Sequence, residues 1–270
     1  MYSTRNKKCM LKLAKKDFLK NRTRNIVAVL AMILTTVLFA TLITTGVGAY
    51  ESVQLTLQKQ KGSKADADIR YMKEEQFEKL SKDERVDFVG LRRPIGFLSN
   101  AKTHNIELDY MDSIEQELTF SVPTLGCAPT KENEIATTDR ALESLGIEPK
   151  VGAEVEIEFV LRNQTYQYQM VVSGIWEAPN SQTSLMLVSD EFMQANEKIF
   201  PYTFDKDRQY AGTYFSDVAL KNTNNMEKQL QDIVVSLGGN PEDANAENYI
   251  AYAVNRITNP EMNVSVLFIG

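Results

Sequence analysis

Residues 26–47 read IVAVLAMILTTVLFATLITTGV, an uncharged run of 22 residues around which the rest of the chain is organised. As a helix rising about 1.5 Å per residue, the run would be about 33 Å long, enough to cross a bilayer core of about 30 Å. Its polar residues are five threonines and one glycine, and a helical threonine can return its hydroxyl hydrogen to the carbonyl four residues earlier. We therefore predict a transmembrane helix over residues 26–47.

The charges on the two sides of this run differ in sign. Residues 1–25 hold nine basic side chains and one acidic side chain, whereas the rest of the chain holds 21 basic and 35 acidic side chains. Because Lys and Arg collect on the cytoplasmic side of a membrane span, we predict a cell-membrane protein with a cytoplasmic N-terminus and an extracytoplasmic main domain. Two alternatives stay open: a buried helix of a soluble protein, and a cleaved signal peptide with its cleavage site near residues 47–49.

Residues 1–25 are predicted to form a basic amphipathic helix on the cytoplasmic side. The apolar residues that fall on one side of this helix are Met10, Leu11, Ala14 and Phe18. The lysines that cover most of the opposite arc are Lys8, Lys12, Lys15, Lys16 and Lys20. Such a helix suits the membrane surface, and equally the charges would serve as a plain topology signal. Nucleic-acid binding is disfavoured, because the basic patch adjoins a membrane span.

The helical pattern continues beyond the span. Residues 48–62 contain no helix breaker before Gly62, and Val53 and Leu57 repeat at a spacing of four. We predict that this segment is a stalk that ends at Gly62. Residues 63–258 then mix helical and strand patterns, so the fold class is predicted to be α+β. The predicted strands are 68–71, 85–98 with a break at Pro94, 105–110, 185–188, 217–220 and 249–254, and the predicted helices are 74–80, one capped by Ser189, and 223/224–237.

The clearest local signal lies between residues 151 and 176. Val155, Ile157 and Phe159 alternate with three glutamates, and a second alternating run includes Tyr168 and Met170. The polar stretch 162–165 separates the two runs. This pattern predicts a β-hairpin with one buried face and one wet face, whose register is firm because a slip by one residue would bury the glutamates.

Chemistry-bearing motifs are scarce in this sequence. It contains no phosphate-binding glycine loop of the G-x-x-x-x-G-K-[ST] type and no G-x-S-x-G nucleophile elbow. Its one histidine, His104, lies in a polar stretch, and its two cysteines, Cys9 and Cys127, are predicted to lie on opposite sides of the membrane. We therefore expect no catalytic, cofactor-binding or metal-binding residues and no enzymatic activity in this chain.

The order of parts and several short runs resemble the N-terminal half of FtsX/MacB-type ABC transporter permeases. The basic run at 13–24 leads into the span as it does in that family. Further runs that resemble the outer domain of the family lie at 123–129, 132–135, 150–155, 169–175 and 218–226. The resemblance implies a permease subunit that works as a homodimer or pseudo-dimer with a cytoplasmic ABC ATPase, which binds the ATP. ATP hydrolysis would then change the conformation of the outer domain and so export, extract or release a substrate, a mode called mechanotransmission.

The resemblance also assigns mechanical roles to residues of this chain. Lys12, Lys16, Phe18 and Arg22 would dock the leader helix against the partner or lipid, while Val53 and Leu57 would pack the stalk against its neighbour. The family has four spans, three of them after the outer domain, so residues 259–270 are expected to be a truncated lead-in to missing spans and the chain a fragment. The alternative is a single-pass anchored binding or adhesion domain without an ATPase.

Overall fold

The structure is a computed structural model of the 270-residue chain, which describes residues 7–103, 105–177, 184–202 and 211–255. His104 and residues 259–270 lie outside the described residues. The chain divides into two compact units, Met1–Val53 and Gln54–Gly270, and each is described here by itself. The predicted boundaries at 25, 47, 62 and 258 stay predictions.

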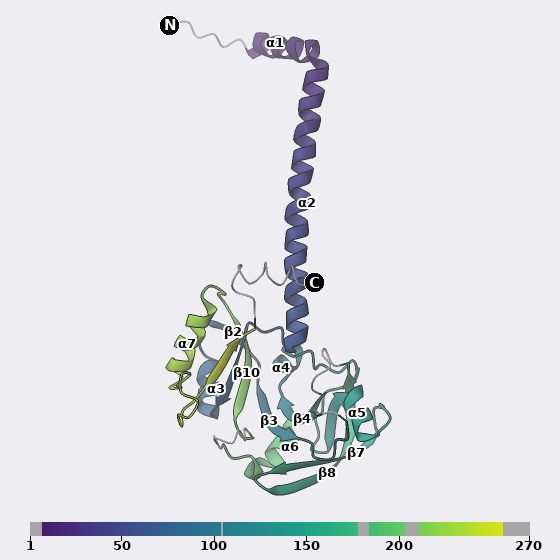
Figure 1. The fold of residues 1–270 in the computed structure, drawn as a ribbon, viewed down its shortest axis with the longest axis vertical. Coiled ribbons are helices and arrows are strands. Elements are labelled where there is room, and N and C mark those ends of the chain that lie inside the picture. Colours follow the sequence, from purple (N-terminus) through teal and green to yellow (C-terminus); the bar gives the residue numbers. More distant parts are fainter. Residues whose placement is uncertain (1–6, 104, 178–183, 203–210, 256–270) are drawn as a thin grey trace. The chain divides into compact units, whose positions relative to one another are not determined.

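The first unit is helical. Helix α1 (Lys7–Lys20) is followed after Asn21 by α2 (Arg22–Lys61), a single helix of 40 residues (Figure 1). The most apolar 18-residue window of α2 has a mean hydropathy of 2.7 and is entirely exposed. The helix is long and apolar enough to cross a membrane, as predicted.

The threonines of α2 satisfy their own hydroxyl groups. Each donates a hydrogen bond to the carbonyl oxygen four residues earlier, as the sequence predicted. The five bonds run from Thr35 to Ala31, Thr36 to Met32, Thr41 to Val37, Thr44 to Ala40 and Thr45 to Thr41. These residues therefore add little polar surface to the helix.

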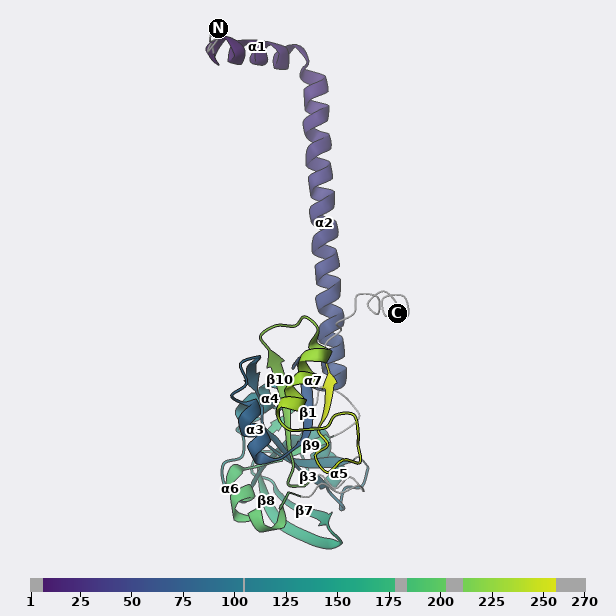
Figure 2. The same cartoon turned by 90° about the vertical axis from the view of Figure 1, so that its left-hand side faces the viewer.

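The second unit is built on one mixed sheet of eleven strands, which confirms the predicted α+β class (Figures 1 and 2). The main strand order is β11-β1-β10-β3-β4-β9-β6-β8-β5, with β2 paired to β10 and β7 paired to β8. The strands are β1 (Ala67–Met72), β2 (Val86–Val89), β3 (Arg92–Phe97), β4 (Ile106–Met111), β5 (Leu125–Gly126), β6 (Glu134–Thr138), β7 (Glu154–Leu161), β8 (Gln164–Trp176), β9 (Ser184–Val188), β10 (Tyr214–Leu220) and β11 (Ala251–Val254). The helices are α3 (Glu74–Leu80), α4 (Ser113–Leu118), α5 (Asp139–Leu145), α6 (Asp190–Ala195), the short 3₁₀ helix η1 (Glu197–Ile199) and α7 (Met226–Ser236).

The smaller of two lobes, here called the sandwich lobe, comprises β1, β2, β10 and β11 with α3 and α7. Its core joins side chains of the strands, such as Ile69 and Val218, to the buried side chains of the helices, such as Leu80 and Leu230. Successive residues of a strand point to opposite faces of the sheet. The face of β10 that carries Val218 therefore meets the helices, and the face that carries Asp217 points the other way.

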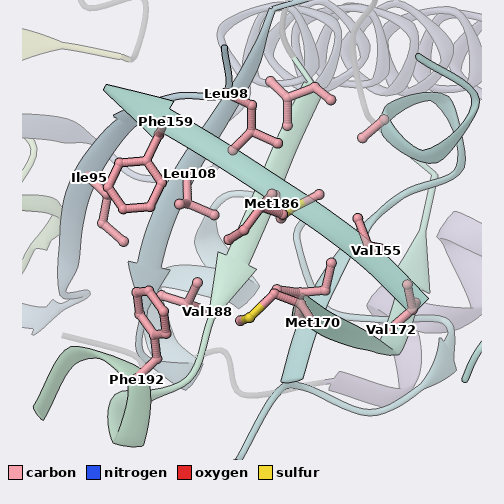
Figure 3. Packing of buried hydrophobic residues seen from close by; sticks show 14 of the residues in the cluster. Ile95, Leu98, Leu108, Val155, Phe159, Met170, Val172, Met186, Val188 and Phe192 are labelled. Atoms are coloured by element: carbon pink, nitrogen blue, oxygen red, sulfur yellow. The ribbon is translucent and has the colours of Figure 1, made fainter. Parts of the chain in front are cut away.

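The larger lobe, here called the barrel lobe, comprises β3, β4, β9, β6, β8 and β7 with α5 and α6. The sheet of this lobe is closed into a barrel. Its first and last strands meet where Leu98, just after β3, forms a bridge with Phe159 of β7. The backbone N–H of Ser99 also donates to the carbonyl of Glu158 over 2.7 Å. Figure 3 shows the enclosed core, where side chains from β3, β4, β7, β8, β9 and α6 come together. Closure of this kind removes a free sheet edge.

The hairpin predicted between residues 151 and 176 is confirmed as β7 and β8, which pair antiparallel from Glu154 opposite Val171 to Leu161 opposite Gln164. Of its predicted inward residues, Tyr166 and Tyr168 are half-buried, and the others are buried: Val155, Ile157, Phe159, Met170 and Val172. The loop is shorter than the predicted polar stretch, however. Arg162 and Asn163 alone make the turn, with φ of 51° and 63°. Two successive positive φ values are the geometry of a type I′ turn, which matches the twist of a hairpin.

Pro94 is the clearest correction to the predicted elements. The predicted break in residues 85–98 lies instead at Gly90 and Leu91, between β2 and β3, and Pro94 is inside β3 opposite Asp109 of β4. Proline lacks an N–H, and the register of β3 against β4 shifts directly after it, between Pro94 and Gly96. Helix α7 also begins at Met226, two or three residues later than predicted, after Asn225 with a positive φ.

We expect Phe159→Ala to lower the free energy of unfolding by about 3–5 kcal/mol, because Phe159 is 1% exposed and stacks on Tyr166 in the barrel core. The one tryptophan, Trp176, is buried, so its fluorescence reports urea unfolding of the protein in detergent micelles. Val160→Ala is the matched control on the same strand: Val160 is 54% exposed, and the expected change is below about 0.5 kcal/mol. Equal losses in both variants would contradict the enclosed core.

Candidate functional site

The end of α2 forms a junction with the domain, and this junction is the candidate functional site. Gly62 adopts a φ of 80°, a left-handed conformation that glycine adopts readily. The N–H groups of Gly62 and Ser63 both donate to the carbonyl of Gln58, at 2.8 and 3.0 Å. These bonds satisfy the carbonyl of Gln58 in the last turn of α2. The prediction that the helix ends at Gly62 is therefore confirmed.

The residues directly after Gly62 are hydrogen-bonded to separate elements of the domain. Lys64 donates its N–H to the carbonyl of Leu118 at the end of α4, over 2.8 Å. Asp66 donates its N–H to Val218 of β10 over 2.9 Å, and its side chain accepts from the N–H of Leu220 over 2.9 Å. The segment after α2 is therefore hydrogen-bonded to both α4 and β10.

The chain leaves the described part of the domain beside the point at which it enters. Lys61, the last residue of α2, donates from Nζ to the carbonyl of Val254, the last residue of β11, over 2.8 Å. Asn255 then donates its N–H to the carbonyl of Asp66 over 2.8 Å. The segment by which the chain enters the domain and the segment at residues 254–255 are thus hydrogen-bonded to each other.

The predicted stalk residues, Val53 and Leu57, are both half-buried. The one buried residue of α2 is Gln54, which the sequence analysis did not single out. An isolated glutamine within a helical pattern carries no local sign that it will be covered. Packing of Val53 and Leu57 against a neighbouring subunit stays a prediction.

The four residues predicted to dock the leader helix, Lys12, Lys16, Phe18 and Arg22, are all exposed. Phe18 is 58% exposed, and its carbonyl accepts a hydrogen bond from Nδ2 of Asn25 over 3.1 Å. Asn25 therefore joins the end of α1 to the start of α2. Docking of these side chains against a partner or lipid stays a prediction.

A buried charged cluster lies next to the junction and was not anticipated from the sequence. At its centre, Arg92 of β3 contacts two acidic side chains of β4: its Nε and Nη2 each lie 2.7 Å from Oδ2 of Asp109, and its Nη2 lies 2.7 Å from Oε2 of Glu107. The side chain of Asp109 is fully buried. Burial raises the pKa of Asp109, and the charge of Arg92 opposes that shift.

Two further acids, Glu115 of α4 and Asp217 of β10, are buried close enough to Arg92 for their charges to act on it. Oε2 of Glu115 accepts a hydrogen bond from the N–H of Asp217 over 3.1 Å. Burial raises the pKa of Asp217 to about 6, and burial together with the nearby charge of Asp217 raises the pKa of Glu115 well above its ordinary value. The local signal for α4 was present in the sequence, since Asp112 caps the helix by accepting from the N–H of Glu115.

The described residues include no group of three or more His, Cys, Asp or Glu side chains arranged to hold a metal ion. Cys127 is a free, exposed thiol.

No protein-family model and no curated protein matches this sequence. Among solved structures, the extracellular domain of the ABC-type transporter YknZ from Gram-positive bacteria matches with a TM-score of 0.44 and 14% identity, over 69% of this chain and 98% of that one. The periplasmic region of MacB from Actinobacillus actinomycetemcomitans matches with a TM-score of 0.45 and 10% identity, over 77% and 95%. A permease-protein domain from Porphyromonas gingivalis matches with a TM-score of 0.43 and 12% identity, over 74% and 94%.

The chain is similar to extracytoplasmic domains of ABC-type transporter permeases. The residues and hydrogen bonds described above, rather than this likeness, are the basis of the function proposed below.

We expect Arg92→Met to lower the free energy of unfolding by about 3–5 kcal/mol at pH 7.5, because Asp109 would lose the cation that compensates its burial. The double variant Arg92→Met/Asp109→Leu removes both charges and should recover a large part of that loss. Urea unfolding followed by Trp176 fluorescence measures both variants. A double variant no more stable than Arg92→Met would show that the ion pair is not what the first change disrupted.

Proposed function

We propose that this chain is the N-terminal part of an ABC transporter permease subunit. In this proposal a partner ATPase on the cytoplasmic side hydrolyses ATP, and the permease converts that event into a conformational change of its extracytoplasmic domain. The result would be export, extraction or release of a substrate at the outer face of the membrane. The chain itself would bind no nucleotide and catalyse no reaction.

The observation that carries the proposal is the continuity of α2. A single helix runs from Arg22, in the basic flank, through the apolar segment to Lys61, at the junction with the domain. A helix without interruption is stiff along its axis, so displacement at one end reaches the other. The hydrogen bonds from Lys64 and Asp66 would then deliver that displacement to α4 and to β10 of the sandwich lobe.

Two further features support the proposal. The basic flank of α2 supports a cytoplasmic N-terminus, where an ATPase would act. The contact between Lys61 and Val254 supports a domain inserted between two membrane segments, because such a domain must begin and end at the same membrane surface. A homodimer or pseudo-dimer of permeases would supply the neighbour for Val53 and Leu57, and the leader residues Lys12, Lys16, Phe18 and Arg22 would face the ATPase or the lipid surface.

The topology is tested with the two cysteines. We expect a membrane-impermeant maleimide to label the Cys9→Ser variant in intact cells, because the free, exposed thiol of Cys127 would lie outside. The matched Cys127→Ser variant should stay unlabelled in intact cells. Labelling of Cys127→Ser in intact cells, or protection of Cys127 there, would contradict the orientation. Loss of residues 1–49 from the mature protein would instead identify a cleaved signal peptide.

The mechanical role of α2 is tested at Gly48. A proline there removes a helix hydrogen bond and kinks the helix, so we expect Gly48→Pro to lower substrate-stimulated ATP hydrolysis by the assembled transporter at least about tenfold. Gly48→Ala is the matched control, since a Cβ at this position meets no atom within 4 Å, and should leave hydrolysis within about twofold. ATP hydrolysis is measured in lipid nanodiscs after co-purification with the ATPase. Failure of any ABC ATPase to co-purify from native membranes would favour an anchored binding domain.

A further inference from the structure

Strand β10 carries an acidic residue, Asp217, at the boundary between the two lobes. This boundary, where β10 pairs with β3, is here called the seam. Val218 and Leu220 of β10 face the helices of the sandwich lobe, so the residue between Ser216 and Val218, Asp217, points toward the opposite face. The same strand pairs with β3 of the barrel lobe, where Phe215 lies opposite Arg92. Asp217 is therefore located where the sandwich lobe adjoins the barrel lobe.

Helix α4 places a second acid against it. Glu115 is 1% exposed and its Oε2 accepts from the N–H of Asp217 over 3.1 Å, a bond between residues 102 positions apart. The contact is closely packed on its other side by Gly90, where an added Cβ would lie 2.3 Å from Oε2 of Glu115. Glu115 is thus held between β10 and the connection from β2 to β3, with no space for a side chain at position 90.

The cations near this pair are engaged with other acids. Arg92 contacts Glu107 and Asp109, and Arg70 of β1 lies 2.6 Å from Asp68. Within the described part of the chain, Oδ2 of Asp217 is buried without a hydrogen-bond partner. The charged and titratable groups that face the pair from the surrounding elements are Asp112 at the start of α4, Arg92 of β3, and Asp68 and Arg70 of β1, and Ser63 after α2 donates a hydrogen bond to Asp217.

We propose that the Glu115–Asp217 pair is a pH-sensitive contact that holds α4 against β10 in mild acid and weakens when Asp217 ionises. Two carboxyl groups that share a buried site and lack a cation of their own cannot both ionise without a large cost. The contact adjoins the junction, because Ser63 bonds Asp217 and Lys64 bonds the end of α4. Outside pH would thereby set how firmly the end of α2 is attached to the seam.

The direction of the effect follows from the pKa of Asp217, which burial raises from 3.8 to about 6. In the unfolded chain the carboxyl group ionises near its ordinary pKa, so the folded protein binds this proton more tightly than the unfolded chain does. The resulting stabilisation is present in acid and is lost as the pH rises through about 6. Between pH 5 and pH 7.5 this group alone changes the folding equilibrium constant by about tenfold.

This inference goes beyond the proposed function and does not depend on an ATPase, so it is tested on the full chain in detergent micelles. Urea unfolding at pH 5 and pH 7.5, followed by Trp176 fluorescence, is compared for wild type, Asp217→Asn and Glu115→Gln. When the pH is lowered from 7.5 to 5, we expect the folding equilibrium constant of wild type to rise about tenfold more than that of Asp217→Asn. Glu117→Gln is the matched control on the exposed side of α4 and should follow wild type.

Hydrogen exchange on the wild-type protein locates the effect without any substitution. We expect exchange in α4 and β10, relative to the β7–β8 hairpin at the same pH, to be several-fold faster at pH 7.5 than at pH 5. The ratio cancels the intrinsic pH dependence of amide exchange. Identical pH responses in wild type and Asp217→Asn, or an unchanged ratio between seam and hairpin, would overturn the proposal. A variant that fails to fold leaves the wild-type exchange experiment to decide.

Discussion

The apolar surface of α2 is the constraint on which the organisation of this protein depends. Its most hydrophobic window is not covered by any described part of the chain, and the threonines within it bond back to their own helix. Burial of apolar surface is worth about 25 cal/mol per Å², so a helix of this kind is stable in a bilayer and costly in water. In the proposed topology, a membrane would separate the basic leader from the acidic domain, and α2 would connect the two.

The end of α2 is attached to the domain by hydrogen bonds of the chain that directly follows it. Gly62 terminates the helix, and within four residues the chain has made backbone hydrogen bonds to α4 and β10. Lys61 adds a bond to the last residue of β11. The attachment thus combines main-chain hydrogen bonds to α4 and β10 with a side-chain bond from Lys61 to β11.

The seam between the lobes combines firm packing with an electrostatic cost. The apolar cores of the two lobes are complete without it, since one is enclosed by the curled sheet and the other lies under α3 and α7. Between them, one arginine serves two acids of β4, and the pair formed by Glu115 and Asp217 has no cation of its own. Buried polar contacts of this kind contribute little net stability and make the seam responsive to protonation.

The sequence by itself determined the features that depend on neighbours within a few residues. The apolar run, the helix stop at Gly62, the hairpin and the Ser189 cap of α6 all rest on such local patterns, and all are present in the structure. Tertiary structure decided the closure of the barrel between Leu98 and Phe159, the place of Pro94 inside β3 and the contact of Glu115 with Asp217. The two long-range contacts join residues 61 and 102 positions apart, as their numbers show. Periodicity cannot specify such partners, because they are selected by how whole strands and helices pack.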